Sequence, residues 1–278
     1  MQPGVKPSAH IKNWANYQGA LRAFEKVAAQ LRAAHVSVVP VKGIVLARWI
    51  YDDVGERPLS DVDLLVSRKA WPEARRALLT LGDAFYDSLE LGELAVSVDG
   101  FAVELHAEMG RLELTDICVD EVIARCTVDT ETFGFPVLRL DEVDHLLLVA
   151  INAVKDGFIL AQPHIAVDLE RFLARGEPAE LVRRARAAGF ATGLYCTAEW
   201  MAEDHGSVRW RELMARLESP RRRWYLRAMR AVRRSKRPIE ALVFTLGFLS
   251  NDRLGPRLRV AARLVRRNAV KLMGRTPP

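Results

Sequence analysis

The sequence holds little cysteine and no long hydrophobic run. Only 3 of its 278 residues are cysteine, and no two of them form a Cys-x-x-Cys pair. This scarcity excludes a disulfide-stabilised scaffold and a thiolate zinc finger, and it fits the reducing cytoplasm in which we expect the protein. The longest apolar run spans about nine residues, whereas a membrane-spanning helix needs about 20. Because the N-terminus also lacks a basic stretch followed by an apolar core, we expect neither a transmembrane segment nor a secretory signal.

Acidic residues are scarce at one end of the chain and abundant in the rest. Residues 219–278 contain 17 Lys and Arg but only 2 Asp and Glu, a net charge of +15. The whole chain has 41 basic and 35 acidic side chains, so residues 1–218 hold 24 and 33 of them, a net charge of −9. We therefore expect an acidic body suited to metal ions, and a basic tail suited to phosphate, nucleic acid, a membrane surface or the body's own carboxylates.

The spacing of apolar residues predicts an α+β core with a mixed sheet, followed by helices. The pair Asp99-Gly100 between two alternating runs indicates a β-hairpin. In the first part we expect helices over 14–34, 44–51 and 69–81, and strands over 36–41, 61–66, 93–98 and 101–106. After a short extended piece at 136–140, we expect helices over 141–156, 165–174, 179–188, 194–203, 209–217, 221–234, 239–249 and 257–273. The predicted domains are a loose arm (1–12), the core (13–120), a helical domain (121–218) and a basic helical tail packed on the body (219–278).

Carboxylates gather on two of the predicted strands. Because strand side chains alternate between faces, Asp61 and Asp63 point the same way, and Glu104 and His106 share a face on the hairpin. If the two strands are neighbours, the three carboxylates Asp61, Asp63 and Glu104 converge and repel one another unless a cation lies among them. Oxygen ligands of this kind favour Mg²⁺ or Mn²⁺ together with substrate phosphates. The alternative is that Asp-x-Asp marks only a solvated strand end.

Residues suited to phosphate precede these carboxylates. Lys42-Gly43 follows one strand and opens a helix, where free backbone N–H groups can hold phosphate. Arg57 and Ser60 lie in the loop that leads directly into Asp61. This context favours a phosphate-handling metal site over a solvated strand end.

The motif block over residues 41–66 resembles a known family, the bacterial uncharacterised nucleotidyltransferases of the DNA polymerase β-like superfamily. The block reads Val41-Lys42-Gly43-Ile44-Val45-Leu46, then Tyr51, then Arg57-Pro58-Leu59-Ser60-Asp61-Val62-Asp63-Leu64-Leu65-Val66. Val103-Glu104-Leu105-His106 is similar to the family's third-carboxylate strand, and Val137-Leu138-Arg139-Leu140-Asp141-Glu142 and Val167-Asp168-Leu169-Glu170 are similar to its helical-domain landmarks. The resemblance covers residues 15–210.

This resemblance implies a minimal nucleotidyltransferase core with Asp61, Asp63 and Glu104 as metal ligands and an NTP as donor. The superfamily commonly has Gly-Ser where this chain has Lys42-Gly43, so the resemblance implies that Lys42 or Arg57 replaces the serine contact to phosphate. His106 could touch substrate or orient a ligand, or be a satisfied polar residue at the sheet edge. Lys155 and Asp168 could face the cleft, although a salt bridge is the simpler role. His145 and the remaining histidines lack metal-ligand spacing and receive no role.

We therefore interpret the chain as a metal-dependent nucleotidyltransferase. It would move a nucleoside monophosphate from an NTP to a hydroxyl-type acceptor, which is a small molecule, a peptide, a protein or RNA, and release pyrophosphate. The alternatives are a toxin–antitoxin-type modifier of tRNA or protein, and a non-catalytic protein on the same fold that binds nucleic acid or membrane. For the basic tail we favour packing on the body over a contact with nucleic acid or an anionic membrane, because its apolar residues must be buried.

Overall fold

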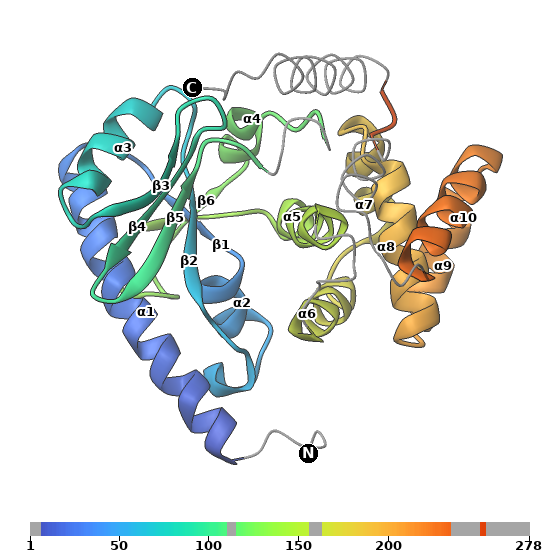
Figure 1. Ribbon diagram of the computed structural model, residues 1–278, viewed down its shortest axis with the longest axis horizontal. Coiled ribbons are helices and arrows are strands. Elements are labelled where there is room, and N and C mark those ends of the chain that lie inside the picture. Colours follow the sequence, from blue (N-terminus) through green and yellow to red (C-terminus); the bar gives the residue numbers. More distant parts are fainter. Residues whose placement is uncertain (1–6, 110–114, 156–162, 235–250, 254–278) are drawn as a thin grey trace, which may run out of the picture. The chain divides into compact units, whose positions relative to one another are not determined.

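The chain divides into two compact units. The computed structural model describes residues 7–109, 115–155, 163–234 and 251–253 (Figure 1). The sheet unit consists of residues 1–109, 117–149 and 163–176, and the helical unit consists of residues 110–116, 150–162 and 177–278. This division differs from the predicted boundary at residue 120, because the later segments 121–149 and 163–176 belong to the sheet unit.

The sheet unit is built on five strands in the order β1-β2-β5-β4-β3. The strands are β1 (Val39–Val41), β2 (Asp61–Leu65), β3 (Ala84–Ser88), β4 (Glu93–Val98) and β5 (Phe101–His106). β2 and β5 are parallel neighbours, while the other adjacent pairs are antiparallel, so the predicted mixed sheet is confirmed. The predicted hairpin is also confirmed: Asp99 and Gly100 both have positive φ, at 50° and 82°, as the favoured two-residue hairpin turn requires.

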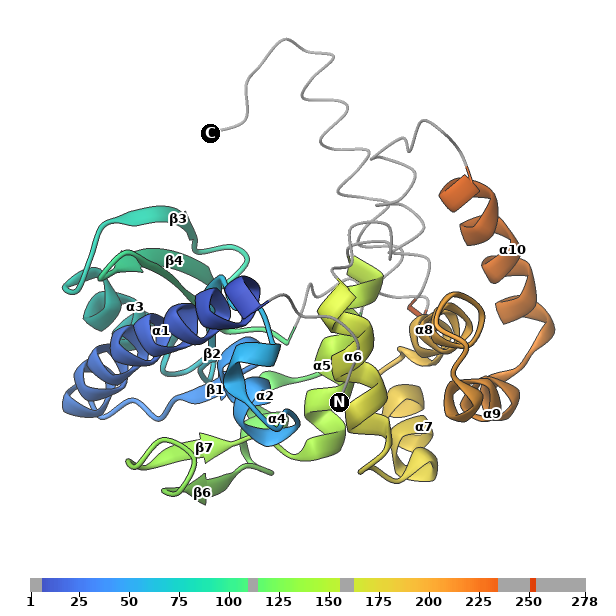
Figure 2. The ribbon, with the colours of Figure 1, turned by 90° about the horizontal axis from the view of Figure 1, so that it is seen from below.

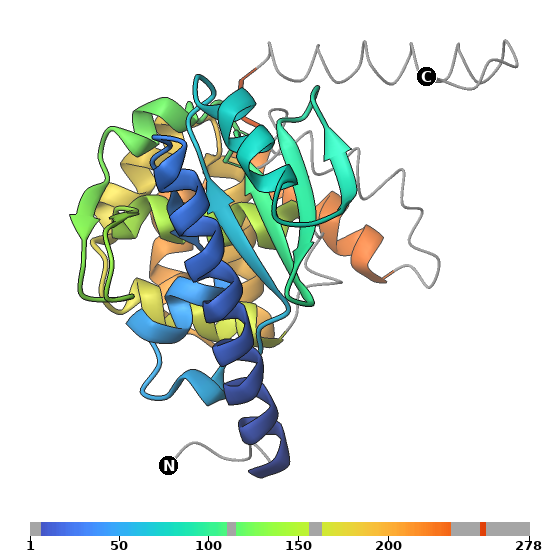
Figure 3. The ribbon, with the colours of Figure 1, turned by 90° about the vertical axis from the view of Figure 1, so that its left-hand side faces the viewer.

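Two helices cover one face of this sheet. α1 (Pro7–Ala33) and α3 (Trp71–Leu79) bury their apolar sides against that face (Figure 3). Tyr17, Phe24 and Leu31 of α1 are fully buried there, together with the inward-facing residues Val62, Leu64, Val103 and Leu105 of the strands. Because side chains alternate along a strand, the carboxylates of β2 and β5 lie on the opposite face.

The first helix and one strand differ from the sequence predictions. α1 begins at Pro7, inside the predicted loose arm, because proline is well suited to the first turn of a helix, where its missing N–H costs nothing. β3 was not predicted, because it is an edge strand whose residues Ala84–Asp87 are all exposed, so no alternation of burial marks it.

Shorter elements complete the sheet unit. α2 (Gly43–Trp49) and the 3₁₀ helix η1 (Val54–Glu56) follow β1, and α4 (Val119–Ile123) precedes a two-stranded sheet of β6 (Thr127–Asp129) and β7 (Val137–Arg139). α6 (Pro163–Leu173) also belongs to this unit, whereas α5 (Glu142–Lys155) begins in it and ends in the helical unit.

The helical unit is centred on α8 (Ala191–Asp204). α8 packs against α7 (Pro178–Ala187), α9 (Val208–Leu217) and α10 (Pro220–Arg234) (Figure 2). Every residue from Ala191 to Ala202 is buried. These helices confirm the predicted helical character of this part of the chain. The helices predicted over 239–249 and 257–273 lie outside the described residues. Among the residues that the structure describes, no helix is both long and apolar enough to cross a membrane.

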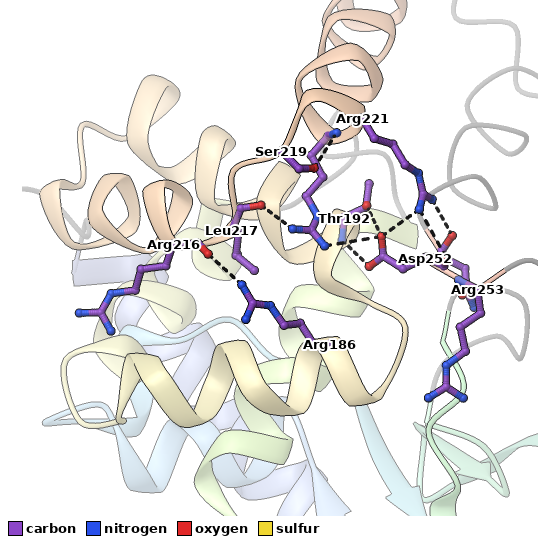
Figure 4. A network of polar contacts seen from close by, with 10 residues as sticks. Arg186, Thr192, Arg216, Leu217, Ser219, Arg221, Asp252 and Arg253 are labelled. Carbon is purple, nitrogen blue, oxygen red and sulfur yellow. Dashed lines mark hydrogen bonds and ion pairs between the residues drawn. The ribbon is translucent and has the colours of Figure 1, made fainter.

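Residues 251–253 of the basic tail are bound to the start of α8. The carboxylate of Asp252 accepts hydrogen bonds from the backbone N–H of Thr192 (2.9 Å) and from its hydroxyl (2.5 Å), and the N–H of Asp252 donates to the carbonyl of Gly189 (2.6 Å) (Figure 4). Arg221 of α10 lies 3.5 Å from the same carboxylate. Asp252 therefore satisfies backbone groups that the N-terminus of α8 leaves free.

Candidate active site

The register of β2 and β5 brings the predicted carboxylates together. Asp63 lies directly opposite Glu104, and Asp61 lies opposite Ala102. Asp63 is 3% exposed, whereas Asp61 and Glu104 are partly exposed. The convergence that the alternation of side chains predicted for neighbouring strands is therefore present on the sheet face away from α1.

His106 joins two of these carboxylates. Its Nε2 atom lies 3.1 Å from Asp63 Oδ1 and 3.5 Å from Glu104 Oε2. Asp63, Glu104 and His106 each offer one ligand atom, and the three atoms lie within 4.8 Å of one another. Two carboxylates and an imidazole at this spacing form a donor set that fits a divalent cation. We call Asp61, Asp63, Glu104 and His106 the carboxylate cluster.

Lys42 points into this cluster. Its ammonium group donates a hydrogen bond to Asp63 Oδ1, and its side chain is 21% exposed. Lys42 precedes α2 with φ 53° and ψ −128°, a backbone conformation that side-chain-bearing residues rarely adopt. The lysine that the sequence suggested for phosphate thus pairs with a predicted metal ligand.

The electrostatics of the carboxylate cluster differ from one acid to the next. Burial, and then the neighbouring Asp63 carboxylate, raise the pKa of Asp61 to about 6. Burial alone would also raise the pKa of Asp63, but the charge of Lys42 and the hydrogen bond from His106 hold that pKa below its usual range. The hydrogen bond from His106 lowers the pKa of Glu104. Asp63 and Glu104 are therefore ionised at neutral pH. Ionisation of Asp61 adds a third negative charge nearby, and the repulsion makes Asp61 a weaker acid.

His145 supports Lys42 from α5. Its Nε2 atom accepts a hydrogen bond of 2.9 Å from the backbone N–H of Lys42, and its side chain is fully buried against the rings of Trp49 and Phe172. Burial, with the charges of Arg57 and Lys42, lowers the pKa of His145 to about 3. The imidazole is thus neutral and can accept this hydrogen bond. Sequence reasoning missed His145, although its place in the buried stripe of a predicted helix was a usable signal.

Arg57 and Asp168 form a second polar group in the sheet unit. Arg57 is 5% exposed and Asp168 is 1% exposed. Arg57 Nε lies 3.0 Å from Asp168 Oδ1 and Nη2 lies 2.7 Å from Oδ2, while the Tyr51 hydroxyl donates to Oδ1 at 2.7 Å. We call Tyr51, Arg57 and Asp168 the arginine clamp. The structure thus pairs Asp168 by a salt bridge and engages Arg57 away from the carboxylate cluster.

The remaining predicted residues have simpler surroundings. A methyl group on Gly43 would lie 2.3 Å from Leu59 Cδ1 and 2.8 Å from Arg57 Nη1, so a larger residue there would require these side chains to shift. Ser60 is exposed, and its hydroxyl hydrogen-bonds the Asp61 carboxylate. Lys155 is exposed at the end of α5.

Comparisons with known proteins found a family model and several solved structures to which this chain is similar. The model of a family described as uncharacterised nucleotidyltransferase matches residues 8–204. Among solved structures, the antibiotic-resistance factor ANT(2'')-Ia is 16% identical, with a TM-score of 0.45 over 60% of this chain and 89% of that chain. The Thermotoga maritima CCA-adding enzyme complexed with tRNA is 14% identical, with a TM-score of 0.24 over 94% of this chain and 83% of that chain. No curated protein matches the chain.

Proposed function

Because this chain belongs to the family of uncharacterised nucleotidyltransferases, we propose that its carboxylate cluster transfers a nucleoside monophosphate from an NTP to an acceptor hydroxyl. In this reaction the acceptor oxygen forms a bond to the α-phosphorus and loses its proton to solvent. The bond from the α-phosphorus to the bridging oxygen breaks, and pyrophosphate leaves. The observation that carries the proposal is the cross-strand pair of Asp63 and Glu104, with His106 in contact with both.

The proposal includes a divalent ion, Mg²⁺ or Mn²⁺, held by Asp61, Asp63 and Glu104. Such an ion, when bound, supplies positive charge that favours the acceptor oxyanion and offsets the charge of the phosphates. The donor set supports this choice, because carboxylates are the ligands that both ions prefer. His106 contacts two of the three carboxylates and would hold them in position, as hydrogen-bonding partners of metal ligands commonly do.

Different residues would bind the donor and support the site. Lys42 would contact the phosphates through its ammonium group, which reaches the carboxylate cluster, and the predicted contacts of Gly43 and Ser60 with the nucleotide stay part of the proposal. Arg57 was predicted to hold the triphosphate, but its guanidinium group donates hydrogen bonds to the carboxylate of Asp168 and to the carbonyl oxygen of Pro58. We therefore assign Arg57 the task of anchoring the loop that leads into Asp61.

Transfer of an α-phosphate label tests the reaction. The protein is incubated with Mn²⁺ or Mg²⁺ and each NTP, labelled either at the α- or at the γ-phosphate, together with separate fractions of protein, RNA and small molecules from a cell extract. We expect the α-label to enter one fraction and the γ-label to appear only in pyrophosphate. The Asp63→Asn variant provides the control and should transfer neither label. Transfer of the γ-label would instead identify a kinase and contradict the proposal.

The same experiment identifies the acceptor. Small molecules, peptides, proteins and RNA all offer a hydroxyl, and the fraction that takes up the α-label decides among them. Label in tRNA or in protein would favour the toxin-type reading of the sequence over a small-molecule acceptor.

A further inference from the structure

Lys42 occupies the place of a cation in the carboxylate cluster. Its ammonium group donates to Asp63 Oδ1, the same oxygen that lies 3.1 Å from His106 Nε2. Glu104 lies directly opposite Asp63 on the neighbouring strand, and Asp61 shares the face of Asp63 on its own strand. A lysine side chain carries a positive charge at neutral pH. A positive charge in the midst of three carboxylates is the arrangement that a bound metal ion would otherwise provide.

The backbone of Lys42 is held in place by a neighbouring helix, α5. Lys42 has φ 53°, and its N–H donates to His145 Nε2 at 2.9 Å. His145 is itself fully buried, so it has little freedom to move. The peptide is therefore held, while the four-carbon side chain beyond it can still turn from one anionic partner to another.

We propose that Lys42 is a built-in cation that changes partners. Without nucleotide its ammonium group binds Asp63. When a nucleotide binds, the ammonium group moves to the phosphates, and Asp63 becomes free to bind a metal ion. This inference rests on the proposed function. An ammonium group and a divalent ion repel each other at one carboxylate oxygen, so either excludes the other. A polyphosphate offers Lys42 a partner of greater negative charge, and the metal and the nucleotide then favour each other's binding.

Binding of Mn²⁺ alone tests the first half of the proposal. Free Mn²⁺ is measured by electron paramagnetic resonance in the absence of nucleotide, for the wild type, Lys42→Met and Lys42→Gln. Both variants should bind Mn²⁺ about tenfold tighter, because one positive charge beside the divalent ion is gone. The matched control is Lys26→Met, which removes a lysine paired with Asp99 at 2.5 Å on the surface and should bind Mn²⁺ like the wild type.

Lys42→Gln is included in case Lys42→Met fails to fold, because the glutamine amide can still donate a hydrogen bond to Asp63. Circular dichroism checks both variants with and without Mn²⁺. A variant that folds only when Mn²⁺ is added also supports the proposal, because the metal then replaces the missing charge. Folded variants that bind Mn²⁺ no tighter than the wild type would overturn it.

Binding of a nucleotide without metal tests the second half. A fluorescent ATP analogue is titrated in the presence of EDTA, and both Lys42 variants should bind it about tenfold more weakly, because they lack the charge that meets the phosphates. If Lys42 is exchanged, its variants bind the metal more tightly and the nucleotide more weakly. If Lys42 only supports the structure, its variants bind both the metal and the nucleotide more weakly. Unchanged nucleotide binding in the Lys42 variants would contradict the exchange. If the wild type binds no nucleotide even when Mn²⁺ is present, the proposed function fails, while the Mn²⁺ result still reports on Lys42.

Discussion

Two of the aspartates that the sheet unit buries, Asp63 and Asp168, each lie beside a basic side chain, and the two are paired in opposite ways. In the arginine clamp, Asp168 receives hydrogen bonds from two guanidinium nitrogens and from the hydroxyl of Tyr51, so both of its carboxylate oxygens have donors. In the carboxylate cluster, Asp63 shares one ammonium and one imidazole with Glu104 and Asp61. The clamp is saturated, while the cluster has more acidic than basic groups.

We infer from this difference that the clamp is a structural polar group and the cluster a functional one. Planar, two-point pairing of arginine with a carboxylate neutralises both charges and fixes both side chains. An excess of carboxylates is costly without a further cation, and the pKa of Asp61, raised to about 6 by burial and by Asp63, expresses this cost. We therefore expect changes in the clamp to alter stability and changes in the cluster to alter ligand binding and catalysis.

The largest effect should follow from Asp63→Asn. This substitution keeps the shape of the side chain and removes a ligand charge, so transfer of the α-label should fall at least about 100-fold, more than the loss of a residue that only orients a ligand. The far-ultraviolet circular dichroism spectrum should stay that of the wild type. Asp87→Asn, at a surface ion pair with Arg75, serves as the control and should keep full activity. If the Asp63→Asn variant kept its activity, the contrast between a functional carboxylate cluster and a structural arginine clamp would be wrong.

Asp168→Ala should act mainly on stability. It leaves the buried charge of Arg57 without its partner, so the free energy of unfolding should fall by about 3–5 kcal/mol, as measured by urea denaturation. The double variant Arg57→Leu/Asp168→Leu should recover part of this loss, because no unpaired charge then remains. If the double variant were stable but inactive, Arg57 would act on the substrate and the clamp would not be purely structural.

Gly43→Ala tests how tightly Gly43 packs against Arg57 of the arginine clamp. The added methyl group would overlap Leu59 and press on Arg57, so the free energy of unfolding should fall by about 1–3 kcal/mol. In Gly176→Ala the methyl group would meet only the Phe172 carbonyl at 3.7 Å, and the change should stay within about 0.5 kcal/mol. Equal losses at the two glycines would show that the space beside Arg57 is not tight.

The last of these effects concerns His145 and acid. Burial, with the charges of Arg57 and Lys42, lowers its pKa to about 3 in the folded protein, against about 6.5 in the unfolded chain. Between these values only the unfolded state takes up the proton, so stability must fall as the pH falls, by at most about 1.4 kcal/mol per pH unit from this residue. His145→Leu should make the fall shallower between pH 6 and 4 in urea denaturation. Parallel curves for the variant and the wild type would contradict this account.

The sequence was informative where a pattern repeats within one element. Alternation along 61–66 and 101–106 predicted which side chains share a face, and the structure confirms that Asp63 and Glu104 face each other. The Asp99-Gly100 pair predicted the hairpin, because its backbone requirement is local. The mixed sheet and the helices that follow were predicted for the same reason.

Partners that are distant in the chain could not be predicted in this way. Arg57 and Asp168 are separated by 111 residues, and Lys42 and His145 by 103, so no periodicity relates them. Arg57 was assigned to the nucleotide because it lies in the loop that leads into Asp61, and His145 received no role because it lacks metal-ligand spacing to other histidines. The start of α1 was missed because Pro7 suggests a loop and a first helical turn equally well.

The parallel register of β2 and β5 has a consequence for how the chain folds. Asp63 and His106 are separated by 43 residues, so the acidic groups meet only after a non-local pairing closes the intervening chain. Such contacts form slowly, because loop-closure entropy is lost before they stabilise the chain. Lys42 and His106 can neutralise Asp63 at that moment without help from solution. We therefore expect the refolding rate in stopped-flow experiments to be the same with Mn²⁺ as with EDTA, so that newly made protein matures independently of the metal supply.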